Sequence, residues 1–317
     1  MTGYSASPSL DVSIVIPLLN EEESLPELME QIHTTLKDTY SYEVIFVNDG
    51  STDRSWSVIK ELDLKYDGVR GLCFRKNKGK SPALQAGFEA AEGRYVVTMD
   101  ADLQDDPGEV PAMLKMLDDG MDLVSGWKKV RHDPITKTIP SRFFNFVTRK
   151  AAGIHLHDFN CGLKAYKKEV VKSIFLYGEL HRYIPLLAKW EGFEKIGEKA
   201  VHHQARKYGV TKFGLNRFMN GFLDLITILF VHRYKHKPMH FFGTIGVFLL
   251  AVGGGINAYL AFIKLVYQVG IGGRPLLFLG ILLMVLGVQF FTVGFLGELI
   301  NSNHVKSQKP PINDILN

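Results

Sequence analysis

The residues best suited to chemistry lie in one stretch, positions 95–107, which reads YVVTMDADLQDDP. Its apolar and β-branched start predicts a buried strand, and the strand ends in Asp100 and Asp102, with Gln104 close behind. In α/β proteins, ligands bind at the carboxyl ends of the strands. Carboxylate and amide oxygens are hard ligands that suit Mg²⁺ or Mn²⁺, and such a metal usually binds substrate phosphates as well. So short a pattern, taken alone, is more often a solvated acidic loop, so the rest of the chain must decide.

Two further predicted strands end in residues that suit a nucleotide. The strand over 43–47 is followed by Asp49, whose carboxylate can hold a base or a ribose hydroxyl. The strand over 69–74 is followed by Gly79 and Lys80, which can meet a phosphate. Each of these segments alone is ordinary turn chemistry. Three polar strand ends in series nevertheless indicate a ligand site.

The elements that must position these residues alternate in type. Besides the strands above, the pattern predicts a strand over 12–17 and helices over 25–36, near 56–62 and over 83–90. Strands that alternate with helices predict an α/β fold with a mostly parallel, doubly wound sheet.

The composition excludes several classes of protein. The chain has 317 residues, a net charge of +4 and 46% hydrophobic residues, so it is neither disordered nor strongly nucleic-acid-like. The two cysteines, Cys73 and Cys161, argue against a disulfide framework and for a reducing compartment. The N-terminal residues show no basic region followed by an apolar core, so we expect no signal peptide.

The C-terminal part of the chain suits a membrane. Residues 241–263 and 275–297 are uncharged and long enough to span it, since about 20 residues suffice. Residues 214–234 are apolar but carry Arg217 and Asp224, which predicts a helix lying at the interface, followed by a basic collar. Basic residues flank the two spans on their outer sides. The positive-inside rule therefore predicts that both termini and the N-terminal domain are cytoplasmic.

Four motifs carry a resemblance to a known family. The segments IPLLNEEESL, FVNDGSTD, NKGKSPALQAG and MDADLQDDP, in this order and spacing, resemble the family 2 glycosyltransferases with the GT-A fold. Within that family the chain is similar to the polyprenyl-phosphate glycosyltransferases, such as dolichol-phosphate mannose synthase and bacterial undecaprenyl-phosphate glycosyltransferases. The narrower marks of this group are SGWKKVR, SRFFN, HRYIPLLA and HHQARKYGVTKFG.

The resemblance implies a domain organisation. It gives a GT-A glycosyltransferase domain over residues 1–212, with a Rossmann-like, mostly parallel sheet. An interfacial amphipathic helix and basic collar over 213–237 would follow, then a two-helix transmembrane domain over 238–300 and a cytoplasmic tail over 301–317.

The resemblance also implies roles for individual residues. The nucleotide-sugar site would consist of Pro17, Glu21, Asp49, Lys80, Asp100 and Ala101. The metal, Mg²⁺ or Mn²⁺, would be held by Asp102 and Gln104. The acceptor phosphate would lie among Lys128, Arg131, Ser141, Arg206 and Lys212, and catalysis would depend on Asp100, Asp102 and Arg206.

One basic residue departs from the family pattern, and five histidines have no assigned chemistry. Where relatives carry Gly-x-Arg, this chain has Lys128 after Gly126, and lysine keeps the charge but loses the bidentate fork of arginine. The chemistry of the HRY mark that begins at His181 does not follow from the sequence. Histidines one apart or adjacent are spaced poorly for a shared zinc site, and this applies to His155, His157, His202 and His203.

We expect a membrane-anchored enzyme that moves one sugar from a UDP- or GDP-linked nucleotide sugar to a polyprenyl phosphate. A phosphate monoester is already ionised at neutral pH, so the acceptor needs no strong general base. Direct in-line attack at C1 would invert the anomeric centre. The implied partners are the two substrates and the membrane, with no nucleic acid, and the family suggests a homo-oligomer, for which a tetramer is one form.

Alternatives of other kinds stay open. The chain could be a non-catalytic nucleotide-sugar sensor or a scaffold for a flippase. It could also be a transferase for another lipid, such as diacylglycerol, whose neutral hydroxyl would need a base. No motif fixes the sugar, the nucleotide base or the length of the lipid.

Overall fold

The structure is a computed structural model, and it describes residues 10–129, 153–204, 237–268 and 270–305 and the single positions 207, 227, 230 and 234. The chain forms two compact units, residues 1–224 and 225–317. Most of the predicted interfacial segment lies outside the described residues. So do four of the predicted site residues, namely Arg131, Ser141, Arg206 and Lys212.

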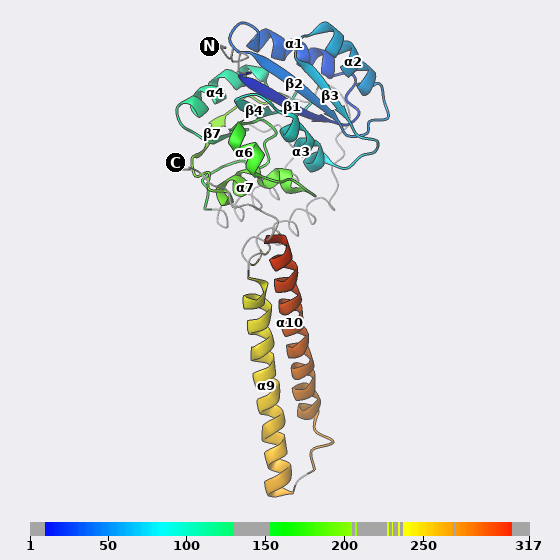
Figure 1. Ribbon diagram of the computed structural model, residues 1–317, viewed down its shortest axis with the longest axis vertical. Helices are drawn as coiled ribbons and strands as arrows, with labels where there is room; N and C mark the ends of the chain where they lie inside the picture. Colours follow the sequence, from blue (N-terminus) through cyan, green and yellow to red (C-terminus); the bar gives the residue numbers. More distant parts are fainter. Residues whose placement is uncertain are drawn as a thin grey trace, which may run out of the picture. The chain divides into compact units, whose positions relative to one another are not determined.

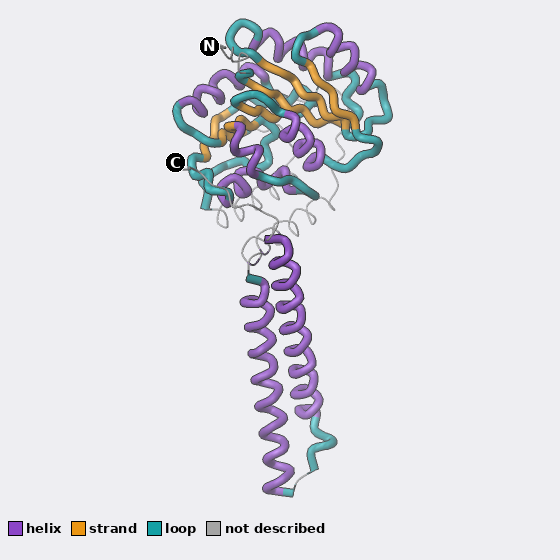
Figure 2. Tube along the Cα trace, in the orientation of Figure 1, coloured by secondary structure: helices purple, strands orange, loops and turns teal. Residues whose placement is uncertain are grey.

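In the described part of the first unit, seven strands form one sheet (Figures 1 and 2). The strands are β1 (Val12–Leu18), β2 (Tyr42–Asn48), β3 (Val69–Cys73), β4 (Tyr95–Thr98), β5 (Leu123–Trp127), β6 (Lys164–Lys167) and β7 (Ile196–Ala200). Their spatial order is β3-β2-β1-β4-β6-β5-β7. β6 runs antiparallel to both neighbours, and the other pairings in this sheet are parallel. The prediction of a mostly parallel α/β sheet is confirmed, with one reversed strand that the pattern did not indicate.

Helices cover both faces of this sheet. They are α1 (Leu25–Leu36), α2 (Ser55–Lys65), α3 (Lys80–Ala90), α4 (Val110–Asp118), α6 (Lys168–Ser173) and α7 (Ile184–Trp190), with short 3₁₀ turns η1 (Pro107–Glu109) and η2 (Leu180–Tyr183). Alternate residues of β1 point to opposite faces. Val12, Ile14 and Ile16 join the core that α1 and α4 complete. Val15 faces α3, where a Cβ at Gly87 would clash with the valine side chain, so glycine lets the helix approach the strand.

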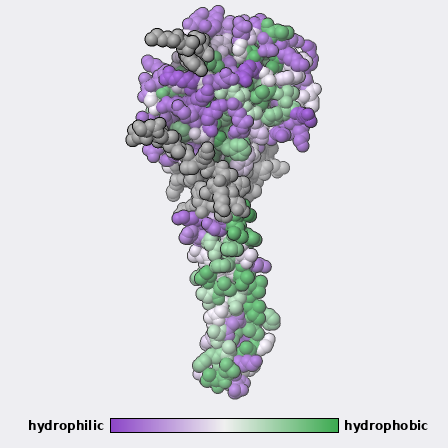
Figure 3. Space-filling model, in the orientation of Figure 1, coloured by the Kyte–Doolittle hydropathy of each residue, from purple (hydrophilic) through white to green (hydrophobic). Residues whose placement is uncertain are grey.

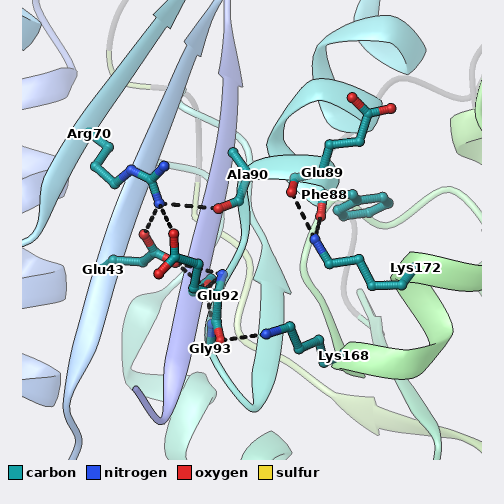
Figure 4. Close-up of polar contacts among 10 residues, drawn as sticks. Glu43, Arg70, Phe88, Glu89, Ala90, Glu92, Gly93, Lys168 and Lys172 are labelled. Carbon is teal, nitrogen blue, oxygen red and sulfur yellow. Dashed lines mark hydrogen bonds and ion pairs between the residues drawn. The ribbon is translucent and has the colours of Figure 1, made fainter. Parts of the chain in front are cut away.

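One buried carboxylate holds the edge of the sheet at which the strands begin. Glu43, 4% exposed, accepts hydrogen bonds from Ser13 Oγ at 2.6 Å, from the Glu92 N–H at 2.9 Å and from Arg70 Nη1 at 2.8 Å. Figure 4 shows this network beside the end of α3. There Lys172 Nζ donates to two carbonyl oxygens of the last turn at 2.6 and 2.8 Å. A cation at a helix C-terminus is favourable, so this edge fixes both the strands and α3.

The second unit contains two long helices, α9 (Pro238–Tyr267) and α10 (Pro275–Val305). They are long and apolar enough to cross a membrane, and the most apolar window of each has a mean hydropathy of 1.9 and 2.5, respectively. Many of their large apolar side chains are exposed, which Figure 3 shows as green surface. The two predicted spans are confirmed as candidate membrane helices.

Small residues let these two helices pack closely. A Cβ at Gly246 would lie 2.7 Å from the carbonyl oxygen of Gly287, and a Cβ at Gly253 would lie 2.7 Å from that of Gly280. Glycine therefore permits backbone contact between the helices, as is common where helices associate in membranes.

Candidate active site

The turn after β4, residues 100–105, carries the predicted metal ligands and is called the acidic turn below. The N–H of Asp100 donates to Asp105 Oδ2 at 3.3 Å and closes the turn. The N–H of Gln104 donates to Asp102 Oδ1 at 3.2 Å. Between Asp102 and Gln104, Leu103 has φ = +59°, in the left-handed region that leucine rarely adopts. The turn therefore carries Asp102 and Gln104, both half-buried, on either side of a strained residue.

Asp100 forms an ion pair with Lys80, the first residue of α3. About a third of each side chain is exposed, 32% for Asp100 and 31% for Lys80. Burial by itself would raise the pKa of Asp100, but the ammonium groups of Lys80 and Lys128 outweigh it and lower the pKa to about 2. Asp100 is therefore ionised at neutral pH.

Asp49 fixes the loop that leads into α3. Its buried carboxylate accepts the N–H of Lys78 at 2.7 Å and the N–H of Gly79 at 2.8 Å, one on each oxygen. The loop after β1 is also tied down, because the N–H of Glu21 donates to the hydroxyl of the first residue of α2 at 3.0 Å. These bonds give Asp49 a role in holding the loop that precedes Lys80. That Asp49 and Glu21 contact a nucleotide stays a prediction.

An open hollow of about 480 Å³ lies at the carboxyl end of β3. It is lined by Cys73, Phe74, Arg75, Lys76 and Lys78. Sequence reasoning missed this set of three cations, although the run RKNKGK at positions 75–80 carries the signal. A hollow with this lining favours an anionic ligand.

A smaller cavity of about 20 Å³ lies between α3 and β6, with room for about one water. Its lining includes Pro17, Lys80, Asp100, Lys164 and His181. Burial lowers the pKa of Lys164, and burial together with Lys80 lowers the pKa of His181 well below its usual value. The N–H of His181 donates to Ser81 Oγ at 2.9 Å, which ties η2 to the start of α3. Sequence reasoning missed Lys164, since a lysine in a polar-looking strand gives no sign of burial.

The segment after β7 lies alongside the acidic turn. The N–H of Gln204 donates to the carbonyl oxygen of Gln104 at 3.0 Å, and Asp105 forms an isolated antiparallel bridge with His203. Arg206, a predicted acceptor residue, comes two positions after Gln204. The start of the predicted acceptor segment is thus bonded to the turn that carries the predicted metal ligands.

The predicted donor-side residues gather at one edge of the sheet. The ends of β1, β2 and β4 and the start of α3 carry Pro17, Glu21, Asp49, Lys80, Asp100, Ala101, Asp102 and Gln104. Lys128, predicted at the acceptor phosphate, follows β5 and pairs with Asp105. Within the described ranges, no three His, Cys, Asp or Glu side chains converge into a metal cage.

The chain belongs to the glycosyl transferase family 2, whose family model matches residues 13–175. It is therefore a glycosyltransferase, and the resemblance noted from its motifs is confirmed.

Two relatives match nearly the whole chain. Over 312 residues it is 39% identical to dodecaprenyl-phosphate galacturonate synthase of Rhizobium johnstonii, covering 96% of this chain and 91% of that protein. Over 294 residues it is 33% identical to undecaprenyl-phosphate 4-deoxy-4-formamido-L-arabinose transferase of Shewanella sediminis, covering 91% and 86%.

Among solved structures, the chain is similar to glucosyl-3-phosphoglycerate synthase of Mycobacterium tuberculosis in complex with Mn²⁺ and UDP-glucose. The TM-score is 0.55 at 22% identity, over 70% of this chain and 79% of that one. This likeness shows a shared fold, and it confirms the predicted GT-A class.

Proposed function

We propose that this glycosyltransferase moves a single sugar from a nucleotide-diphosphate sugar to a polyprenyl phosphate at a membrane surface. Both relatives are named after a polyprenyl phosphate, one dodecaprenyl and one undecaprenyl. The observation that carries the proposal is the hydrogen bond from the Gln204 N–H to the Gln104 carbonyl. It joins the acidic turn to the segment that contains Arg206, and a transferase of this kind must hold two phosphate-bearing substrates together.

The donor would bind along the ends of β1, β2 and β4. Lys80 and the basic hollow beyond β3 supply positive charge for a diphosphate. Asp49 and Asp100 carry carboxylates in this region, and hydroxyl groups of the nucleotide sugar are suitable donors to them. Pro17, Glu21 and Ala101 would complete the site.

Asp102 and Gln104 fit a divalent cation. They offer a carboxylate and an amide oxygen from one turn, and such hard donors suit Mg²⁺ or Mn²⁺. A Mg²⁺ held by few protein ligands takes the others from water and substrate phosphates. When bound, the ion would neutralise the charge that builds up on the departing diphosphate.

The acceptor is proposed to react without a strong general base, because a phosphate monoester is already ionised. Attack at C1 from the side opposite the diphosphate inverts the anomeric centre. Two negative substrates repel each other, so the acceptor needs cations of its own. Arg131, Arg206 and Lys212, with the hydroxyl of Ser141, are the proposed set.

The proposal includes the arrangement in the membrane. α9 and α10 would span it, with the residues before Lys237 and the tail after residue 300 on the cytoplasmic side. The domain bounds expected from the sequence, at 212, 237 and 300, belong to the same proposal. Formation of a homo-oligomer stays a prediction.

A donor and acceptor screen tests the reaction. The full chain, purified in detergent, is incubated with undecaprenyl phosphate and a panel of UDP- and GDP-sugars that includes UDP-galacturonate. We expect release of nucleoside diphosphate with one donor and only when the lipid phosphate is present. Release of nucleoside diphosphate with diacylglycerol in place of the lipid phosphate would contradict a polyprenyl phosphate acceptor. Tight binding of a nucleotide sugar without turnover would indicate a sensor.

A further inference from the structure

Lys128 and Asp105 form a buried ion pair beside the acidic turn. Lys128 Nζ lies 3.0 Å from Asp105 Oδ1, and their side chains are 15% and 1% exposed. This oxygen has no hydrogen-bond partner among the described groups, so the ammonium of Lys128 is the group that balances its charge. Removing one partner of a buried pair leaves the other charge uncompensated in the interior. The two residues, 23 positions apart in sequence, therefore depend on each other.

The other oxygen of Asp105 closes the acidic turn on itself. Oδ2 accepts the N–H of Asp100 at 3.3 Å. The backbone of Asp105 also bridges to His203. A single residue thus connects the end of β4, the end of β5 through Lys128 and the segment after β7.

The acidic turn has a strained backbone, and the contacts of Asp105 stabilise it. Leu103, 5% exposed, sits at φ = +59° between Asp102 and Gln104. A bulky residue in this conformation costs free energy and persists only where surrounding contacts fix it. The bonds of Asp105 fix the carboxyl-terminal half of the turn, together with the hydrogen bond from the Gln204 N–H to the Gln104 carbonyl.

Lys128 is poorly placed to serve a ligand in solvent. Burial alone would lower the pKa of Lys128, but Asp105, Cys161 and Asp100 raise it above its usual value, so the ammonium stays charged. That charge faces carboxylates on the turn.

We propose that Lys128 is a positioning residue, which braces the acidic turn through Asp105 so that Asp102 and Gln104 keep the arrangement that binds a divalent cation. This replaces the role at the acceptor phosphate that the motif resemblance implies for Lys128. The inference rests on the proposed function for the metal alone and is independent of which sugar or lipid is used.

Measurements of metal binding and of acceptor use distinguish a positioning role for Lys128 from a role at the acceptor phosphate. The variants are Lys128→Met, Asp105→Asn and the double variant, with Lys129→Met as the matched control. Lys129 is exposed and its Nζ lies 5.9 Å from the centre of the Trp127 ring. Each full-length protein in detergent is titrated with Mn²⁺ in the presence of UDP and, separately, GDP, and free Mn²⁺ is followed by EPR. The KM for undecaprenyl phosphate is measured in parallel.

We expect each single variant to weaken Mn²⁺ binding by about 10-fold or more, with the KM for the lipid phosphate changed less than about 2-fold. The double variant should be no weaker than the worse single variant, because partners in one contact are not additive. Lys129→Met should match the wild type. Lys128→Arg, which keeps the charge, should retain most of the Mn²⁺ affinity, and it serves if Lys128→Met fails to fold.

Three results would contradict the positioning role of Lys128. The first is an unchanged Mn²⁺ affinity in folded Asp105→Asn, and the second is a raised KM for the lipid phosphate with normal Mn²⁺ binding in Lys128→Met or Lys128→Arg. The third is a loss of Mn²⁺ affinity in the double variant that equals the sum of the two single losses. A wild-type protein that binds no Mn²⁺ would overturn the metal of the proposed function as well. That outcome is distinguishable, because it appears before any variant is made.

Discussion

Asp102 and Gln104 lie on either side of Leu103, whose backbone is held in the left-handed region. Strain of this kind costs on the order of 1–3 kcal/mol and is concentrated at functional sites. The metal site predicted from Asp100, Asp102 and Gln104 is therefore supported by an independent feature, the backbone conformation of Leu103.

Asp102→Asn should abolish turnover while the protein stays folded. The amide removes the negative charge that a divalent cation needs, and Asp102 is half-buried, so the change disturbs little packing. Product formation, thermal unfolding and dependence on added Mg²⁺ or Mn²⁺ are the measurements. Asp106→Asn is the control, because Asp106 caps η1 and asparagine caps equally well. Full activity of Asp102→Asn, or of the wild type in excess chelator, would contradict the metal site.

Arg206→Ala should weaken use of the polyprenyl phosphate far more than binding of the nucleotide sugar. Loss of a charge-assisted hydrogen bond to phosphate costs roughly 1.5–3 kcal/mol. KM values for both substrates are compared with those of Lys207→Ala, whose ammonium pairs with Glu27 at 2.7 Å near the surface. Equal damage to both KM values would assign Arg206 to the fold or to the donor.

The low pKa of Asp100 predicts a pH dependence of stability. Its folded value of about 2 lies below the ordinary 3.8. Folding therefore favours the ionised form, and this stabilisation is complete above the ordinary pKa and is lost as pH falls through the folded pKa. The difference in unfolding temperature between wild type and Asp100→Asn should be constant from about pH 7 to about pH 5 and should shrink toward about pH 2. A difference that does not change over this range would show that the charge of Asp100 does not contribute.

The polar strand ends could be predicted from the sequence where a predicted strand runs into polar residues, as with Asp49 and Asp100. Contacts between distant segments could not. The Lys128–Asp105 pair joins residues from different strand ends, and the burial of Lys164 follows from its pairing in β6. Neither is visible before the sheet order is known.

At the scale of elements, the sheet order explains what the pattern could and could not predict. The strands β1 to β4 alternate with helices and are mostly apolar, so their type and parallel direction were predicted. β6 reads KAYK, with too few apolar residues to mark a central strand, yet it lies between β4 and β5. Its position is set by pairing on both sides, which a single-sequence pattern does not encode.

The buried carboxylate at the opposite edge should carry measurable stability. Glu43→Ala removes a buried acceptor from a serine hydroxyl, a backbone N–H and Arg70, so we expect a loss of about 1–3 kcal/mol in the free energy of unfolding. Glu92→Ala is the control, since the Glu92 carboxylate is 71% exposed and lies 3.4 Å from Arg70, and it should cost less than about 1 kcal/mol. Denaturation of the purified chain measures both. Equal losses would show that burial of Glu43 adds nothing.

For the whole molecule, the two candidate membrane helices α9 and α10 predict two crossings, and the basic residues that flank them predict the direction of those crossings. We expect both ends in the cytoplasm, with the loop around Gly272 outside. Gly272→Cys and Ser302→Cys are made separately in a chain that lacks Cys73 and Cys161. A membrane-impermeant thiol reagent on intact cells should label only the first. Labelling of Ser302→Cys alone would show the opposite orientation and would contradict catalysis on the cytoplasmic side.

The bond between the Gln204 N–H and the Gln104 carbonyl has a thermodynamic consequence for the whole enzyme. In the proposed arrangement, a shift of the acidic turn on binding the nucleotide sugar would also move the segment that leads to Arg206. The two binding equilibria would then be linked, and linkage is reciprocal. Whatever factor the sugar donor applies to the affinity for the lipid phosphate, the lipid phosphate applies to the affinity for the donor. The order of arrival changes which affinity is observed first and leaves the free energy of assembling the ternary complex the same.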